Sequence, residues 1–214
     1  MNIIENYTNI KEEVSLLNPK TKLVIVTKNQ NIENINKLIE MCHLDFGENK
    51  VQEAILKWTD IINNNKKINL HLIGSLQSNK AKDAFKIFNY VHSLDSEKLA
   101  RIFSDLEKND ERKIKYFIQV NIGNEDQKNG INVSLVFDFV EYCQKDLKLN
   151  ILGLMCIPPV NDSPEAYFLK LKKLNADSYL KDLSMGMSND FEIAIKLGST
   201  FVRIGTAIFG KRSN

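Results

Sequence analysis

Short apolar runs alternate with longer amphipathic segments along most of the chain. An opening segment, 3–17, has the apolar spacing of a helix. Runs typical of β-strands cover 22–28, 44–48, 69–74, 90–94, 115–122, 149–157, 180–185 and 201–205. Segments that predict helices lie near 31–41, 49–62, 78–87, 96–108, 133–145, 163–176 and 189–197. This alternation predicts parallel strands joined by crossover helices.

The number of strands indicates a barrel. Eight strand-like runs, each but the last followed by a helical segment, match a (β/α)8 TIM barrel. Several runs, such as 23–26 and 116–120, are apolar on both faces, as strands covered by helices outside and core within should be. An open doubly wound sheet is the alternative. Because no linker-like segment divides the sequence, we expect an α/β protein with one barrel domain, 1–214, and an extra N-terminal helix.

Composition narrows the function classes. The chain has 214 residues, and its 29 basic and 27 acidic residues give a net charge of +2 without a dense basic run, so nucleic acid is not an expected partner. Cys42, Cys143 and Cys156 lie far apart, which predicts neither a disulfide framework nor a zinc site and fits a reducing cytosol. With no signal-like N-terminus and no apolar run of about 20 residues, we expect a cytoplasmic protein that does not enter a membrane.

Distinctive polar residues follow the predicted strands at their carboxyl ends. In barrel enzymes this face carries the active site. Loops are polar in any fold, so the clustering is stronger evidence than any single residue. The residues are Lys28, Gly47, Glu48, Asn49, Gly74, Ser75, Gln77, Ser78, Asn79, Lys80, Ser93, Asp95, Asn121, those from Ser184 to Ser188, Gly205 and Thr206.

Lys28 and Arg203 each have two readings. A lysine after a strand is commonly a solvated cap. Beside the apolar face of Val24 and Val26, its amine would instead have a lowered pKa and form a Schiff base readily. Arg203 interrupts the last apolar strand, and a buried guanidinium needs an acceptor. That acceptor is either a carboxylate in a structural ion pair or a ring nitrogen of a ligand.

The stretch 184–188 combines small hydroxyls with a glycine directly before a predicted helix, and Gly205 and Thr206 add a second such element. Backbone amides at such places bind phosphate, and barrels often hold phosphate after strands seven and eight. The alternative is ordinary capping, with Asn189 as N-cap and Glu192 three residues later. A lysine at the end of the first strand and a phosphate cradle after the last would suit a phosphorylated aldehyde.

Other catalytic patterns are missing from the sequence. The histidines His43, His71 and His92 lack metal-ligand spacing, and no zinc-protease, nucleophile-elbow, dinucleotide or P-loop motif occurs. His71 lies inside an apolar strand and is predicted to be a satisfied core histidine. A hydrolase or a Rossmann dehydrogenase is therefore disfavoured.

The chain resembles the pyridoxal phosphate homeostasis protein family, the YggS/PROSC type, over nearly its whole length. Two departures are Ser75, where many members have proline, and Thr27, where serine is common. The matching blocks occur in the family's order at Val26–Lys28, Phe46–Glu53, His71–Lys80, Val120–Ile122, Lys128–Ile131, Gly153–Met155, Leu183–Ser188 and Val202–Gly210.

The resemblance implies a fold-type III barrel similar to the N-terminal domain of alanine racemase. It implies pyridoxal 5'-phosphate as a covalent aldimine with Lys28, beside Asn49. Arg203 would lie near the pyridine nitrogen. Ser184, Ser188, Gly205 and Thr206 would surround the phosphate, with the division between the two serines left open.

The resemblance also implies a protein that binds, buffers and delivers pyridoxal phosphate, with apo pyridoxal phosphate enzymes as recipients and no established turnover. We expect a carrier, because the sequence ends at Asn214 soon after the eighth strand, without a second domain to supply a catalytic base. We expect a monomer, because no long exposed apolar stripe beyond the barrel helices is evident. Arg203 would also keep the ring nitrogen unprotonated and so a weak electron sink. One alternative is a small racemase, lyase or decarboxylase that uses Cys156 or Lys80. Another, a cofactor-free Schiff-base aldolase, is disfavoured because the sixth strand has no lysine.

Overall fold

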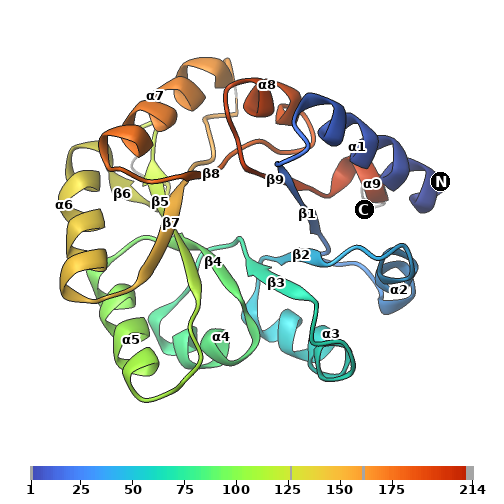
Figure 1. Cartoon of the computed structure of the whole chain (residues 1–214), viewed down its shortest axis with the longest axis horizontal. Coiled ribbons are helices and arrows are strands. Elements are labelled where there is room, and N and C mark those ends of the chain that lie inside the picture. The colour runs from blue at the N-terminus through green and yellow to red at the C-terminus, as the bar shows by residue number, and fades with distance from the viewer. Residues whose placement is uncertain (1, 126, 161, 211–214) are drawn as a thin grey trace.

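Eight parallel strands close into a barrel in the computed structural model (Figure 1). The structure describes residues 2–125, 127–160 and 162–210, so the remaining positions of the predicted domain 1–214 lie outside the described residues. Neighbouring strands follow one another around the ring, and the pairings β4–β5 and β1–β9 close it. The predicted TIM barrel is confirmed, and the open sheet is wrong. The strands are β1 (Lys22–Val26), β2 (Asp45–Glu48), β3 (Asn69–Leu72), β4 (Tyr90–Leu94), β5 (Lys115–Asn121), β7 (Asn150–Met155), β8 (Asp182–Ser184) and β9 (Phe201–Ile204).

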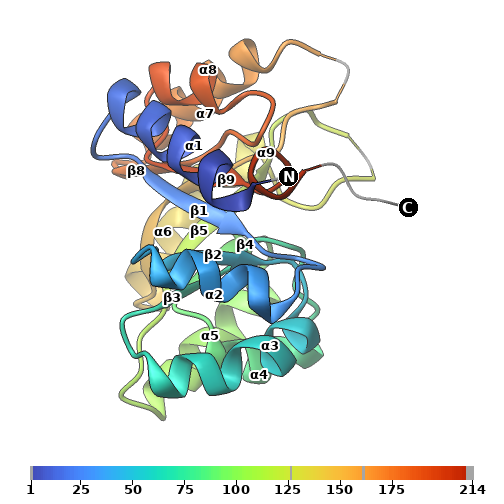
Figure 2. The same cartoon turned by 90° about the vertical axis from the view of Figure 1, so that its right-hand side faces the viewer.

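Helices surround this ring, and two views at right angles show them outside the strands (Figures 1 and 2). They are α1 (Ile3–Leu17), α2 (Ile32–Glu40), α3 (Val51–Asn64), α4 (Ala81–Ile87), α5 (Glu97–Lys108), α6 (Val136–Glu141), α7 (Pro164–Asp177), α8 (Phe191–Lys196) and α9 (Thr206–Phe209). None of the helices within the described ranges is long and apolar enough to cross a membrane.

Local chemistry explains where several helices begin. Asn31 and Ser96 accept hydrogen bonds from backbone amides three residues later, so they cap α2 and α5. The predicted N-cap Asn189 is wrong, because α8 begins at Phe191 with Asp190 as its N-cap. The carboxylate of Asp190 instead accepts a hydrogen bond from the amide of Met187 at 2.6 Å. Because this turn precedes the helix, the helix begins two residues later than predicted.

Four short elements differ from the predicted pattern. The segment η1 (Ser78–Lys80) precedes α4, and η2 (Val133–Leu135) precedes α6, so two predicted helices begin with a 3-10 turn. A π-helical segment, η3 (Tyr142–Asp146), follows α6. The two-residue strand β6 (Ile131–Asn132) pairs with the end of β5 and was not predicted, because it is too short for a periodic pattern.

The interior of the barrel has its own small core, separate from the layer between strands and helices. This inner core is the apolar cluster of Val24, Tyr90, Phe117, Met155 and Phe201, contributed by five different strands. Large side chains of the outer layer include Trp58, Phe103 and Phe168. The inner core matters for function because polar side chains of the same strands run through it.

Candidate functional site

Four adjacent strands bring the predicted site residues to one end of the barrel. Lys28 lies two residues after β1, and Asn49 follows β2 directly. β1 pairs with β9, with Val24 opposite Arg203 and Ile25 opposite Ile204. The strand order β2-β1-β9-β8 continues to Ser184, the last residue of β8. The two ends of the chain therefore meet at the carboxyl end of the barrel, as predicted.

The backbone before Lys28 is anchored to a buried carboxylate. Glu48 is fully buried, and its Oε1 accepts from the Thr27 hydroxyl at 2.7 Å and from the Trp58 indole at 3.0 Å. Lys57 Nζ lies 2.7 Å from the same oxygen and also donates to the Thr27 carbonyl at 2.7 Å. Thr27 is thus held through its side chain and its backbone, which fixes where the half-buried Lys28 leaves the strand.

The residue after Lys28 is anchored to the same cluster. The amide of Asn29 donates to Glu53 Oε1 at 2.6 Å, and Lys57 Nζ lies 2.9 Å from that oxygen. Asn29 has a φ of 60°, a conformation that asparagine adopts more readily than most residues. The turn that carries Lys28 is therefore held on both sides.

Asn49, like Glu48 and Ser93, has a buried side-chain oxygen without a hydrogen-bond partner in the described part of the chain. In Asn49 this atom is Oδ1. A buried acceptor without a donor is costly, so native proteins rarely leave one. Gly74 presses on the same residue: a Cβ there would lie 2.3 Å from the Asn49 carbonyl oxygen. A ligand with a hydrogen-bond donor would satisfy the amide oxygen.

A second polar group forms where the segment after β8 meets the end of β9. The amide of Ala207 donates to Ser188 Oγ at 3.2 Å, which brings Ser188 beside Gly205 and Thr206. Gly205 lies close to β1, because a Cβ there would be 3.1 Å from Val26 Cβ. Thr206 is exposed and Ser188 is half-buried. Two hydroxyls and a glycine backbone open to solvent suit a small anion such as a phosphate group.

Arg203 points into the barrel, where it is only 4% exposed. Its guanidinium donates to Ser184 Oγ at 2.7 Å and to the Cys156 carbonyl at 3.0 Å. Within the described part of the chain, no carboxylate lies at ion-pair distance from Arg203, so the predicted structural ion pair is wrong. Burial lowers the pKa of Arg203, but a guanidinium remains charged at neutral pH.

Ser184 and Ser188 have different surroundings. The Ser184 hydroxyl is completely buried and contacts Arg203 and His92, whose Nδ1 lies 2.7 Å away. Ser188 lies near the surface, as described above. His71 is a satisfied core histidine, as predicted, because both ring nitrogens have partners, Asp45 at 3.0 Å and His92 at 3.0 Å.

Sequence reasoning placed Glu48 among the polar residues at the strand ends but gave it no role, and it missed the contacts of Glu48 with Lys57, the part of Glu53, and the contacts of His92. An acidic residue at the end of the apolar run 44–48 was the available signal for Glu48. Nothing in the sequence pointed to a role for Lys57, since a lysine on an amphipathic helix is usually a solvated residue.

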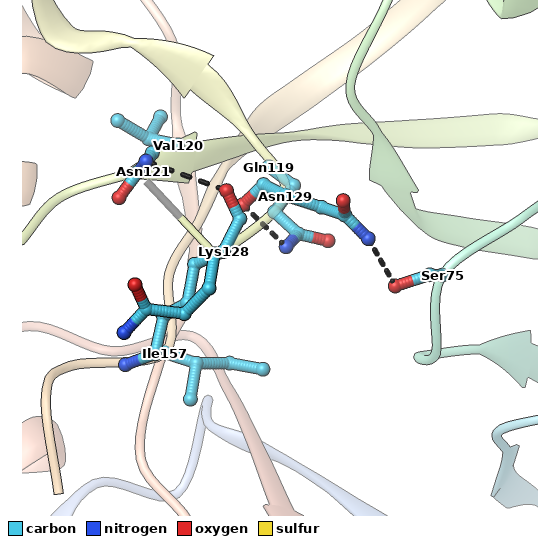
Figure 3. Close-up of a pocket in the computed structure, with 8 residues that line it drawn as sticks. Ser75, Gln119, Val120, Asn121, Lys128, Asn129 and Ile157 are labelled. Carbon is cyan, nitrogen blue, oxygen red and sulfur yellow. Dashed lines mark hydrogen bonds between the residues drawn. The ribbon is translucent and has the colours of Figure 1, made fainter. Parts of the chain in front are cut away.

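A hollow near the carboxyl ends of β5 and β7 is lined by Ser75 and Asn121, two of the predicted polar residues, but by none of the residues expected to bind the cofactor (Figure 3). Asn129 donates to Ser75 Oγ at 2.7 Å across it, and Gln119 donates to the Asn129 carbonyl at 3.0 Å. Asn121 and Lys128 also line it. β5 lies four strands from β1 around the ring, so this hollow lies across the barrel from the turn that carries Lys28.

Comparisons with known proteins agree on one group of relatives. The family model described as "Alanine racemase, N-terminal domain" matches residues 2–213. A pyridoxal phosphate homeostasis protein of Pasteurella multocida is 36% identical over 201 residues, which cover 89% of this chain and 86% of the relative. One from Vibrio cholerae is 38% identical over 89% of this chain and 85% of its own length.

Solved structures extend this similarity to the fold. PipY of Synechococcus elongatus, solved without PLP, superposes with a TM-score of 0.90 at 31% identity and covers 98% of this chain and 100% of its own. The same protein with PLP bound gives a TM-score of 0.88 at 30% identity, with the same coverage. Alanine racemase from Bartonella henselae shares the fold, with a TM-score of 0.78 at 15% identity over 99% of this chain and 60% of its own.

Proposed function

The chain belongs to the family of the alanine racemase N-terminal domain and to the pyridoxal phosphate homeostasis proteins, and we propose that it holds and delivers pyridoxal phosphate through a Schiff base with Lys28. The observation that carries this proposal is the pairing of β1 with β9, which brings Lys28 and the group of Ser188, Gly205 and Thr206 to one end of the barrel. The relatives' name and the PLP-bound structure of PipY support it.

Each site residue then has one role. Lys28 supplies the amine, and the unpartnered Oδ1 of Asn49 accepts a hydrogen bond from the ligand. Ser188, Gly205 and Thr206 hold the phosphate. Arg203 directs an N–H toward the ring nitrogen, and Ser184 holds Arg203 instead of the phosphate, because its hydroxyl is buried against the guanidinium.

The charge of Arg203 favours a carrier over a catalyst. Bound pyridoxal phosphate supplies an aldehyde for reversible attachment and a ring that withdraws electrons when its nitrogen is protonated. Arg203 keeps its own proton and so leaves the nitrogen unprotonated. Burial raises the pKa of the Cys156 thiol to about 12, which argues against this residue as the catalytic base of a racemase or lyase.

We place the protein in the cytoplasm as a monomer that supplies apo pyridoxal phosphate enzymes. Cys42, Cys143 and Cys156 are free thiols, which fits a reducing compartment.

The experiment is to add pyridoxal phosphate to the purified protein, reduce with borohydride and locate the modified residue by mass spectrometry. We expect a yellow protein modified at Lys28, and a folded but colourless Lys28→Ala variant. Lys50→Ala, which removes an exposed lysine just after the neighbouring strand β2, is the matched control and should stay yellow. A wild-type protein that takes up no pyridoxal phosphate would refute the proposal. Steady turnover of any member of an amino-acid panel would refute the carrier.

A further inference from the structure

A continuous chain of hydrogen bonds crosses the interior of the barrel. It starts at Arg203 near the carboxyl end of the strands and ends at Asp45, the first residue of β2. The contacts are Arg203 Nη1 to Ser184 Oγ at 2.7 Å, Ser184 Oγ to His92 Nδ1 at 2.7 Å, His92 Nε2 to His71 Nδ1 at 3.0 Å, and His71 Nε2 to Asp45 Oδ1 at 3.0 Å. Five strands contribute one residue each, so only the closed barrel assembles this chain.

Packing fixes the rings of the two histidines. His71 stacks on Tyr90 with centroids 4.2 Å apart and planes within 9°. His92 stacks on Phe117 at 4.5 Å and 25°. Both imidazoles are fully buried, so no water competes for their nitrogens. Burial lowers the pKa of both histidines, and the charge of Arg203 lowers that of His92 further, so both rings are neutral at pH 7.

The two residues at the ends of this hydrogen-bond chain, Arg203 and Asp45, set the direction of every hydrogen bond in it. Arg203 can only donate, and an ionised carboxylate can only accept. Burial raises the pKa of Asp45, but the hydrogen bond from His71 and the charge of Lys22 lower it more, so this carboxyl is ionised at neutral pH. The His71–Asp45 contact is therefore a hydrogen bond from a neutral imidazole to a carboxylate.

One arrangement of hydrogens satisfies these limits. Arg203 donates to Ser184, Ser184 to His92 Nδ1, His92 Nε2–H to His71 Nδ1, and His71 Nε2–H to Asp45. The reverse arrangement would turn a lone pair of His71 toward the Asp45 carboxylate, which is repulsive. Hydrogen bonds that point the same way polarise one another, so the carboxylate of Asp45 at one end of the hydrogen-bond chain stabilises the positive charge of Arg203 at the other end.

We propose that Ser184, His92, His71 and Asp45 are positioning residues that hold the Arg203 guanidinium in one orientation and compensate its buried charge through aligned hydrogen bonds. This accounts for an arginine that has no carboxylate at ion-pair distance in the described ranges. The proposal deepens the proposed function, because it rests on that function for the role of Arg203 toward pyridoxal phosphate.

The first test needs no variant and no ligand. The chain contains three histidines, so nitrogen-15 NMR of the protein without pyridoxal phosphate resolves each ring. We expect His71 and His92 as neutral Nε2–H tautomers at pH 7. His43 serves as the internal reference, because its Nε2 faces the Asp45 carbonyl oxygen at 2.9 Å and must carry hydrogen. An Nδ1–H tautomer or an imidazolium at either chain histidine would overturn the proposal.

The second test measures coupling between the two ends. Asp45→Asn keeps an acceptor for His71 but removes the charge, so the Kd for pyridoxal phosphate should rise roughly fivefold. In a Ser184→Ala background, where the chain is cut, the same change should alter Kd less than about twofold. Asp182→Asn, at the start of β8, is the matched control and should leave Kd unchanged.

The outcomes separate the two proposals. Equal effects of Asp45→Asn with and without Ser184, or equal effects of Asp45→Asn and Asp182→Asn, would show that Asp45 is merely structural. If the wild-type protein took up no pyridoxal phosphate, the proposed function would fail. The tautomers of His71 and His92 would still decide whether the aligned hydrogen-bond chain is present.

Discussion

Replacing Lys57 with methionine tests whether the carboxylate cluster holds the turn that carries Lys28. The side chains of Lys57 and Glu48 are 11% and 0% exposed, and the ammonium also donates to the Thr27 carbonyl. Methionine preserves most of the side-chain length and apolar contact. The change therefore leaves Glu48 with its two neutral donors, Thr27 and Trp58, and without a cation at 2.7 Å.

The expected loss follows from the burial of the pair. Removing one partner of a buried ion pair costs about 3–5 kcal/mol, because the remaining charge is uncompensated. We take the lower value, about 3 kcal/mol, because two hydrogen bonds to the Glu48 carboxylate remain. For a chain of this size each kcal/mol lowers the melting temperature by about 2–4 °C, so Lys57→Met should melt about 6–12 °C lower.

Urea unfolding of the wild-type protein, Lys57→Met, Lys108→Met and the double variant Lys57→Met/Glu48→Gln measures the loss in free energy of unfolding. Lys108→Met is the matched control: Lys108 lies 3.4 Å from Asp105 with both side chains more than half exposed, so its loss should stay within about 0.5 kcal/mol. Glu48→Gln in the Lys57→Met background should recover much of the stability, since it removes the unpaired charge. A loss below about 1 kcal/mol for Lys57→Met, or no recovery in the double variant, would refute the reasoning.

Three further results are expected. Burial lowers the pKa of His43 from 6.5 to about 4, so the unfolded chain binds this proton first, and the free energy of unfolding should fall as the pH drops through that window. His43→Gln should reduce this pH slope, measured by urea unfolding, by up to about 1.4 kcal/mol per pH unit. Thr206→Val should weaken pyridoxal phosphate binding by about 1–2 kcal/mol in a spectroscopic titration, and unchanged affinity would remove Thr206 from the site. Gly74→Ala should cost about 1–3 kcal/mol in urea unfolding and weaken the same binding, because the new Cβ would displace Asn49; wild-type stability would contradict the close approach.

Much of the fold could be predicted from periodicity, because each long element keeps one face apolar. The runs 90–94 and 115–122 match β4 and β5 to within one residue. Strand ends were overestimated where apolar residues continue past the last ladder bond, as at 149–157, where β7 ends at Met155. β6 and α9 escaped prediction, since elements of two and four residues show no period.

The candidate site was predictable only where a residue type is unusual for its place. A lysine after a buried strand and an arginine within one stand out in the sequence, and the structure shows why Arg203 is there: it meets Ser184. Glu48 and Lys57 lie nine positions apart on a strand and a helix, and no spacing rule brings such residues together. Their contact depends on how α3 packs against β2.

Ser184 and Ser188 show most sharply what closure of the barrel adds. In the sequence they are equivalent small hydroxyls four positions apart, and either could bind phosphate. The structure turns Ser184 inward, where Arg203 donates to it and its own hydrogen must go to His92. A serine that already accepts from a guanidinium and donates to a histidine has little capacity left for a phosphate oxygen. In the proposed function the phosphate contact therefore belongs to Ser188, and in the proposed hydrogen-bond chain Ser184 links Arg203 to Asp45 at the far end of the barrel.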